Sequence, residues 1–482
     1  MSKITSLSDD ALIAVDNIGD AARSLLHPTL RFGVTGLSRA GKTVFITSLV
    51  HNLLHGGRLP LFAAYSEGRL SSAELQPQPD DATARFQYED HLNALLEEKT
   101  WPNSTRAISE IRIRLKYESA SGWSRTFGAG ELTLDIVDYP GEWLLDLPLL
   151  GKSFEQWSRE ALALSHLPNR SDLAEEWHKA LEAVDPAANA DETQARHLAA
   201  VFTDYLRACR EDKTALSTLP PGRFLMPGDL EGSPALTFSP LPPSQGDAGK
   251  DSLQAMMERR YESYKSIVVK PFFREHFARI DRQIVLVDAL QALNAGPAAV
   301  ADLETALSDI LGCFNHGKRS WLTSLFSTRT ERILFAATKA DHLHHENHDR
   351  LEAILSKLVE KAAERARFAG AKVDVVAMAA IRATREAEIE QEGESLPVIV
   401  GKPLAGETID GQTFDGKTKT AIFPGDLPDN PAKAFAESEA GDLRFVRFTP
   451  PALEKTAEGI TLSLPHIRLD RAMEFLFGDA LR

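Results

Sequence analysis

The segment GLSRAGKT, from Gly36 to Thr43, has the spacing of a phosphate-binding P-loop. Phosphate oxygens need several donors at short range, and the two glycines let backbone amides point toward them. Lys42 would bring a positive charge to the outer phosphates, and the Thr43 hydroxyl would bind magnesium. The helix that follows would add the positive end of its dipole. We therefore expect nucleotide contacts from these loop residues: Gly36, Ser38, Arg39, Ala40, Gly41, Lys42, Thr43 and Val44.

A second motif, DYPG, runs from Asp138 to Gly141 at the end of an apolar segment. On its own so short a string is more often a strand-ending turn, but its position after the P-loop favours a nucleotide site. Asp138 is expected to hold the magnesium shell, usually through water, while the Gly141 amide meets the terminal phosphate.

Glu142 follows this motif, next to the expected position of the terminal phosphate. A carboxylate can position an attacking water, but its negative charge would repel the γ-phosphate. We therefore expect slow intrinsic hydrolysis, below about 1 s⁻¹ without a partner protein.

A third motif, TKAD, runs from Thr338 to Asp341 and also ends an apolar segment. Asp341 can accept hydrogen bonds from both the ring N–H and the exocyclic amine of guanine, whereas adenine would leave it unpaired. The Lys339 stem can cover one face of the base. The usual motif begins with Asn, and Thr338 departs from it, so guanine is expected and an ATP-using protein stays an alternative.

Three further positions could complete the base pocket. A backbone amide at Ala380 or Ile381 could bond the guanine oxygen, although strand-end packing explains this apolar stretch nearly as well. His342 could line the pocket directly after TKAD. Trp101 could pack beside the nucleotide or belong to the core.

A threonine between the P-loop and DYPG should close on magnesium and the last phosphate. Thr105 is the best placed, just before a predicted strand, and Thr100 and Ser104 are its rivals. The predicted magnesium ligands are therefore Thr43, Thr105 and Asp138.

Two arginines could stabilise charge in the transition state. Arg106 follows Thr105 and Arg39 lies within the P-loop, although surface solvation is the commoner fate of a single arginine. The candidate catalytic residues are Lys42, Thr105, Arg106, Gly141 and Glu142.

For Asp288 and for the histidines after TKAD, a structural role is favoured over metal binding. Asp288 ends the apolar run VLVD and could compete for magnesium, but a structural role is favoured. His344, His345 and His348 crowd the loop after TKAD, and no carboxylate is spaced in sequence to complete a metal site with them.

The elements that must position these residues alternate along the chain. Apolar runs separated by helical periodicity predict a parallel, doubly wound sheet of the P-loop NTPase type, with three layers. The charged-apolar alternation of residues 108–118 predicts an edge strand. The predicted strands span 30–34, 108–118, 130–138, 282–290, 332–341, 372–381 and 443–451, and helices are predicted at 8–27, 43–54, 88–98, 301–314, 349–367 and 464–481.

A long stretch of helical periodicity interrupts this alternation and predicts a large helical insertion. Loops and short β-like pieces dominate the region before the C-terminal helix. The predicted organisation is an N-terminal helix at 1–27, a first core half at 28–149, the insertion at 150–276, a second core half at 277–384, a small β-containing segment at 385–450 and a closing helical segment at 451–482.

Composition excludes several classes of protein. The formal charge of −15 disfavours general nucleic-acid binding, because phosphates would repel most of the surface. The start of the chain has no signal-peptide pattern, and the most apolar long window, 284–303, holds Asp288 and Asp302, which a membrane span would have to bury. Cys209 and Cys313 form no disulfide framework. A cytoplasmic protein is expected.

Several long strings resemble the YcjX-like family of bacterial P-loop GTPases. They include GLSRAGKTVFITSLVHNLL, DIVDYPGEWLLDLPLL, VLVDALQALNAG, FAATKADHL and the pair GKPL and FPGDLP. The resemblance covers nearly the whole chain. It implies GTP and GDP binding with magnesium, a switch in the stress response, and a protein partner sensed through the switch regions, with a membrane-associated partner among the options. A nucleotide-gated interaction protein with negligible turnover is the alternative.

Overall fold

An eight-stranded sheet forms the centre of the computed structural model. Strands β5, β1, β6, β7 and β8 are parallel neighbours, and β4 runs antiparallel to β5. The two-residue strand β3 (Ala84–Arg85) pairs with β4. In spatial order the main strands are β2 (Leu70–Gln76), β4 (Ser109–Tyr117), β5 (Gly130–Asp138), β1 (Thr29–Gly36), β6 (Arg282–Val287), β7 (Arg332–Ala337) and β8 (Lys372–Ala377).

The structure describes most of the chain from residue 28 onward. The helix expected at 8–27 lies outside the described residues, as do Ser38, Ser104 and Arg106. The described ranges are 28–37, 39–78, 81, 83–103, 105, 107–120, 130–212, 215, 218–244, 248–276, 279–312, 330–391, 394–435, 443–452 and 463–482.

The prediction that residues 108–118 form an edge strand is wrong. Strand β2 pairs with β4 on its outer side, from Leu70 opposite Tyr117 to Gln76 opposite Arg112. The sequence of β2, LSSAELQ, has two serines and a glutamate, and none of its residues is fully buried. Its apolar pattern is therefore too weak to reveal a strand, whereas the alternation in β4 reflects one half-buried face.

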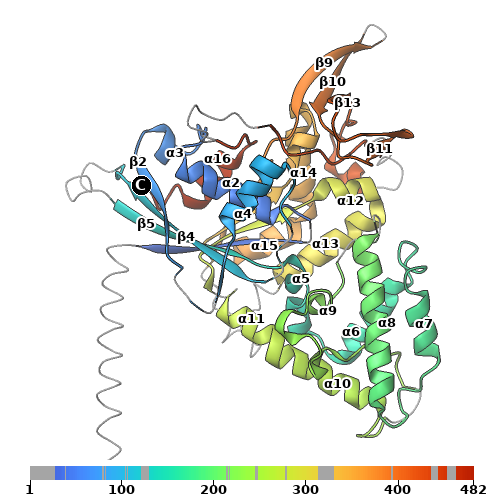
Figure 1. Cartoon of the computed structure of the whole chain (residues 1–482). Coiled ribbons are helices and arrows are strands. Elements are labelled where there is room, and N and C mark those ends of the chain that lie inside the picture. Colours follow the sequence, from blue (N-terminus) through green and yellow to red (C-terminus); the bar gives the residue numbers. More distant parts are fainter. Residues whose placement is uncertain are drawn as a thin grey trace, which may run out of the picture.

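Helices cover both faces of the sheet, which confirms the predicted three-layer α/β fold (Figure 1). Alternate residues of one strand enter different cores: Ile284 and Leu286 pack with α2 (Lys42–Leu54) and α16 (Leu469–Phe477). Val285 and Val287 face the other side. That side is covered by α13 (Pro297–Gly312), α14 (His348–Leu358) and α15 (Glu360–Phe368). The other helical elements of the core are short: α3 (Ala63–Ser66), α4 (Tyr88–Asn93), η1 (Ala94–Glu98), α12 (Ala289–Ala295), η9 (Ala340–His342) and η10 (His345–Asn347).

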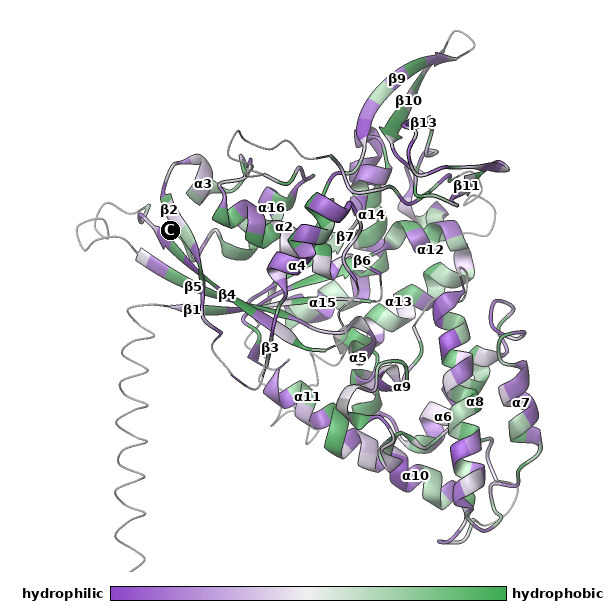
Figure 2. Cartoon of the chain, in the orientation of Figure 1, coloured by the Kyte–Doolittle hydropathy of each residue, from purple (hydrophilic) through white to green (hydrophobic). Residues whose placement is uncertain are grey.

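The predicted helical insertion forms a separate group of helices below the sheet in Figure 1. Its interior is aromatic: Trp157 stacks on Tyr261 with ring centroids 5.1 Å apart, and Trp177 stacks on Tyr205 at 5.3 Å. Figure 2 shows α8 in alternating hydrophilic and hydrophobic bands, as expected of a helix with one buried face. The insertion contains α6 (Phe154–Ser165), α7 (Glu175–Glu182), α8 (Glu192–Glu211), α9 (Gly222–Leu225), η4 (Gly228–Leu230), η5 (Pro234–Leu236), α10 (Leu253–Tyr264), η6 (Lys265–Val269) and α11 (Lys270–Glu275).

A short segment joins β5 to this insertion. It consists of α5 (Gly141–Leu144) and the 3-10 turn η3 (Leu147–Gly151), and it is almost entirely buried. The insertion is also tied to the second half of the core, because the guanidinium of Arg170 pairs with Asp302 of α13 at 2.7 Å. Both side chains are buried, so each charge needs the other.

A small three-stranded sheet projects from the core at the top of Figure 1. The expected strand at 443–451 is wrong, since that segment makes only an isolated bridge between Phe448 and Pro403. Two backbone hydrogen bonds flank this bridge, from the amide of Leu404 to the carbonyl of Arg447 and from the amide of Thr449 to the carbonyl of Lys402. The projecting strands are β9 (Arg385–Gln391), β10 (Glu394–Gly401) and β13 (Thr420–Ile422), beside β11 (Thr408–Ile409), β12 (Gln412–Thr413) and the turn η11 (Pro431–Phe435).

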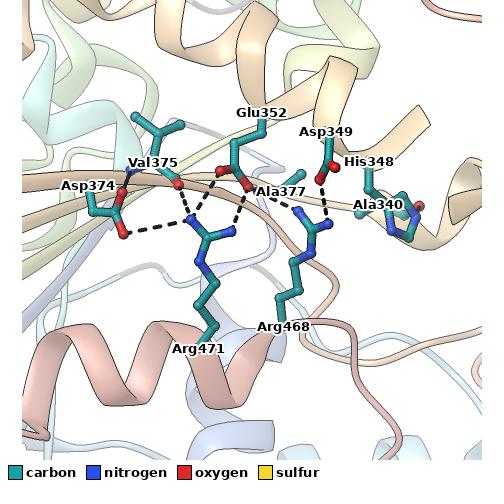
Figure 3. Close-up of polar contacts among 9 residues, drawn as sticks. All are labelled: Ala340, His348, Asp349, Glu352, Asp374, Val375, Ala377, Arg468 and Arg471. Carbon is teal, nitrogen blue, oxygen red and sulfur yellow. Dashed lines mark hydrogen bonds and ion pairs between the residues drawn. The ribbon is translucent and has the colours of Figure 1, made fainter. Parts of the chain in front are cut away.

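The closing helix predicted within 464–481 is present as α16. Two arginines fix it to the core through one carboxylate (Figure 3): Arg471 binds both oxygens of Glu352 at 3.0 and 3.1 Å, and Arg468 binds one at 3.0 Å. This bidentate geometry is the strong form of an ion pair. Within the described residues, no helix combines the length and the apolar character that crossing a membrane requires.

Candidate functional site

The three sequence motifs lie at one edge of the sheet because they follow parallel strands. The P-loop leaves β1, DYPG leaves β5 and TKAD leaves β7. Val34 of β1 lies opposite Asp138 in the register of the sheet, so the P-loop and DYPG begin side by side. In open α/β sheets, ligands bind at the carboxyl ends of the strands, where the connections diverge to opposite faces.

The P-loop has the backbone expected of a phosphate cradle. Gly41 has a φ of 87°, in the left-handed region that favours glycine, and α2 begins at the next residue. The Lys42 ammonium is buried and donates to the carbonyl of Gly36 at 3.1 Å. Burial lowers the pKa of Lys42, and the nearby carboxylates of Asp138 and Glu142 act in the opposite direction.

The three predicted magnesium ligands come together in the structure. The hydroxyls of Thr43 and Thr105 are 3.3 Å apart, and Thr105 donates a short hydrogen bond to Asp138 Oδ2. Asp138 Oδ1 is buried and accepts no hydrogen bond from the described part of the chain. Burial raises the pKa of Asp138 to about 6, against the opposing influence of Lys42. Two hydroxyls and a carboxylate with an unused oxygen are the donor set that magnesium prefers.

Gly141 allows the DYPG segment to touch the P-loop. A Cβ at this position would lie 2.4 Å from the carbonyl oxygen of Gly36 and 3.0 Å from Lys42 Nζ. Any side chain would therefore push the two motifs apart. The close approach places the Gly141 backbone beside the P-loop and the Lys42 ammonium.

Glu142 is buried and has a charged partner that the sequence analysis did not identify. Arg210, at the end of α8, places its guanidinium 3.1 Å from the Glu142 carboxylate. The repulsion expected between Glu142 and a γ-phosphate is therefore partly offset by this guanidinium, and slow hydrolysis stays a prediction. Of the two arginines considered from sequence, Arg39 is exposed and Arg106 lies outside the described residues.

The TKAD motif forms a tight, buried turn. Lys339 has a φ of 62°, and its ammonium forms a short ion pair with Asp288. Asp288 also caps α12 by accepting a hydrogen bond from the amide of Gln291, which gives it the structural role that the sequence favours. Asp341 is 4% exposed and accepts a 2.8 Å hydrogen bond from the amide of Ala383.

The loop after β8 lies beside Asp341, since the amide of Ala383 in this loop donates to that carboxylate. The carbonyl of Ala380 accepts a 2.6 Å hydrogen bond from Ser48 of α2. Ile381 packs in a small cluster with Leu95 and Leu464. These contacts fix the loop between the P-loop helix and the segment that precedes α16. Ala380 and Ile381 are thus close to the other predicted base-pocket residues, although their contact with a base stays a prediction.

Three aromatic rings connect the base end of the site with the small β-containing segment. Trp101 donates from its indole N–H to the carbonyl of Phe448 at 2.6 Å, and His342 meets the Phe448 ring edge to face at 5.2 Å. Burial lowers the pKa of His342, which favours its neutral form. Phe448 carries no sequence signal for this role, because its segment looks like an ordinary strand.

The histidines after TKAD support the turn. His348 contacts the carbonyl of Ala340 at 2.9 Å through its Nε2 (Figure 3). His345 pairs with Glu386 at 2.8 Å, and His344 lies 3.7 Å from Glu346. The expectation that no carboxylate is spaced in sequence to join these histidines is wrong, because ligand atoms of His344, His345 and Glu346 lie within 4.8 Å of one another.

Comparison with known proteins shows the family of this chain. A family model described as YcjX-like family, DUF463, matches residues 30–481. The chain belongs to the YcjX-like family. It is 40% identical over 466 residues to a protein of Escherichia coli K12 called Ras-like GTPase YcjX, covering 94% of this chain and 96% of that protein. A protein of the same name from Shewanella oneidensis MR-1 is 36% identical over 493 residues, covering 97% and 99%.

Proposed function

We propose that this chain binds GTP and GDP with magnesium and hydrolyses GTP. The observation that carries the proposal is the meeting of Thr43, Thr105 and Asp138 beside Lys42, with the Asp341 carboxylate at the other end of the same edge. The two relatives named as Ras-like GTPases support it. Bound magnesium would neutralise charge on the outer phosphates, and the chain would supply its ligands from these three residues.

The choice of guanine rests on Asp341. A carboxylate accepts from two neighbouring donors, and guanine offers a ring N–H and an amine on one edge. Adenine offers no such pair, and a buried acceptor left without a partner costs binding free energy. Lys339, held by Asp288, would support the base from one side.

We further propose that intrinsic hydrolysis is slow and that the nucleotide cycle serves as a switch. The family resemblance supports a place in the bacterial stress response, with a protein partner that reads the nucleotide state. Slow turnover is supported by Glu142, because a carboxylate that depends on Arg210 for its counter-charge fits less well beside the γ-phosphate than a neutral water-orienting amide.

Calorimetry on the full chain tests the proposal. GDP and GTP should bind more tightly than ATP, by at least tenfold, and magnesium should strengthen GTP binding. Lys42→Ala should lose GTP binding, with Lys357→Ala, which is half exposed on α14, as the matched control. An absence of heat with every guanine nucleotide would refute the proposal.

A further inference from the structure

The helical insertion lies directly on the segment that follows DYPG. Trp143 donates from its indole N–H to the carbonyl of Met226 at 3.2 Å, and the Arg223 guanidinium lies 3.1 Å from the centre of the Trp143 ring. Gly222 approaches even more closely, since a Cβ there would be 1.8 Å from the carbonyl oxygen of Glu142. Helices α5 and α9 are therefore in direct backbone contact, next to the predicted phosphate site.

Buried hydrogen bonds hold this contact in place. Asp146, which follows α5, accepts from the amide of Gly222 at 2.7 Å and from the Tyr264 hydroxyl at 2.6 Å. The three residues come from the connecting segment, α9 and α10. Helix α8, which carries Arg210 near its C-terminal end, packs against α9, and the Arg210 guanidinium lies beside the Glu142 carboxylate.

The charges at this contact are arranged around the Glu142 carboxylate. The Glu142 side chain is 4% exposed, and a buried carboxylate needs a positive partner. Lys42 lies within electrostatic reach, but it also faces Asp138 and would be needed by the phosphates of a nucleotide. Arg210 lines a cavity shared with the P-loop residues Leu37, Arg39 and Ala40, so its guanidinium is beside the phosphate loop as well.

We infer that Arg210 is a positioning residue for GTP hydrolysis: it holds the Glu142 carboxylate and balances its charge, so that Glu142 orients the attacking water beside the γ-phosphate. The inference rests on the proposed function. In the reaction, the water oxygen bonds to the γ phosphorus while the bond from that phosphorus to the β–γ bridging oxygen breaks. GDP leaves with the bridging oxygen. The released phosphate carries the water-derived oxygen and one of the two water protons, and the other proton passes to the solvent.

The ion pair between Arg210 and Glu142 explains how a carboxylate can lie beside the γ-phosphate, which its negative charge would otherwise repel. With Arg210 in place, the Glu142 pair is neutral as a unit and keeps an oxygen that can accept from water. It also makes hydrolysis depend on the insertion, because Arg210 belongs to α8. A shift of α8 by a partner protein would then remove the counter-charge without touching the nucleotide.

Single-turnover GTP cleavage by the full chain tests the inference. Arg210→Ala should slow cleavage by about 10- to 100-fold, while GDP affinity measured by calorimetry changes less than about threefold. Arg210→Lys should recover part of the rate, since it restores the charge. Arg207→Ala, one turn earlier on α8 and more than half exposed, is the matched control and should cleave at the normal rate.

The double variant gives the decisive comparison. Glu142→Gln needs no counter-charge, so E142Q and E142Q/R210A should cleave GTP within about threefold of each other. If the double variant is slower than E142Q by tenfold or more, Arg210 acts on the phosphate directly and the inference is overturned. Equal rates for R210A and the unaltered protein would also overturn it.

If R210A alone fails to fold, the rates of E142Q and E142Q/R210A can still be compared. The double variant has neither the Glu142 charge nor the Arg210 charge, so it leaves no buried charge of this pair without a partner. A failure of the proposed function looks different. In that case the unaltered protein would not bind GTP, or would bind it without any cleavage, before the variants are compared.

Discussion

The hydroxyl of Thr105 donates to the Asp138 carboxylate, although Thr105 precedes β4 and Asp138 ends β5. Thr43 of the P-loop completes the group at 3.3 Å from Thr105. The hydrogen bond occupies one oxygen of Asp138 and leaves the other unused. A cation placed among these oxygens would replace contacts that the three side chains now make with one another.

The magnesium site can be tested through the metal dependence of nucleotide binding. Asp138→Asn should lower GTP affinity about 10- to 100-fold in magnesium and change it little in EDTA, because only the metal-bound form uses the carboxylate. Asp135→Asn is the control, since Asp135 lies in the same strand but pairs with Arg112. Equal losses with and without magnesium would assign Asp138 a purely structural role.

Asp341→Asn should change which base is preferred. An asparagine offers one acceptor and one donor, which matches the ring N–H and the 2-oxo group of xanthine in place of the two donors of guanine. GDP affinity should fall at least 100-fold, and XDP affinity should rise relative to it. Competition of unlabelled XDP and GDP against labelled XDP measures this. An unchanged preference for GDP would show that Asp341 does not contact the base.

Asp146 should make the contact between α5 and α9 sensitive to pH. Burial raises the pKa of Asp146 from an ordinary value of 3.8 to about 6 in the folded chain. The folded state therefore binds this proton more tightly than the unfolded state does. The contribution of Asp146 to the free energy of unfolding is fully present below about pH 4 and is lost as the pH rises through about 6. The unaltered protein should lose up to about 3 kcal/mol relative to Asp146→Asn over this range.

Urea unfolding of both proteins at pH 4, 5, 6 and 7 measures the difference. Asp204→Asn provides the control, because Asp204 is exposed on α8 and should give a curve parallel to that of the unaltered protein. Parallel curves for Asp146→Asn as well would contradict the predicted pKa shift.

Phe448 should connect the stability of the small β-containing segment to nucleotide binding. Phe448 is 2% exposed and packs with Ile399, Phe414 and Val446. Phe448→Ala should destabilise this segment by about 3 to 5 kcal/mol and make residues 385–450 cleavable by protease. GDP affinity should fall as well, because His342 loses its contact. Phe368→Ala is the control, since Phe368 is 97% exposed.

The local parts of the site could be predicted from sequence, and the long-range parts could not. The P-loop, DYPG and TKAD are short strings whose neighbouring strands are visible as apolar runs, so the topology of parallel strands then brings them together. Arg210 has no such signal, because it lies in a helix rich in charged residues and meets Glu142 only after the insertion folds. Phe448 and β2 are similar cases, in which the deciding contact comes from a distant segment.

The position of β1 between β5 and β6 has a consequence for how the chain reaches this structure. The amide of Arg31 donates to Asp281, 250 positions along the chain, so the central strand is completed only by residues beyond the insertion. Closing so long a loop carries an entropic penalty and slows folding of a sheet that depends on it. An insertion that folds early would bring its two ends together and shorten the effective loop, and we expect variants that disrupt the Trp157–Tyr261 stack to refold more slowly.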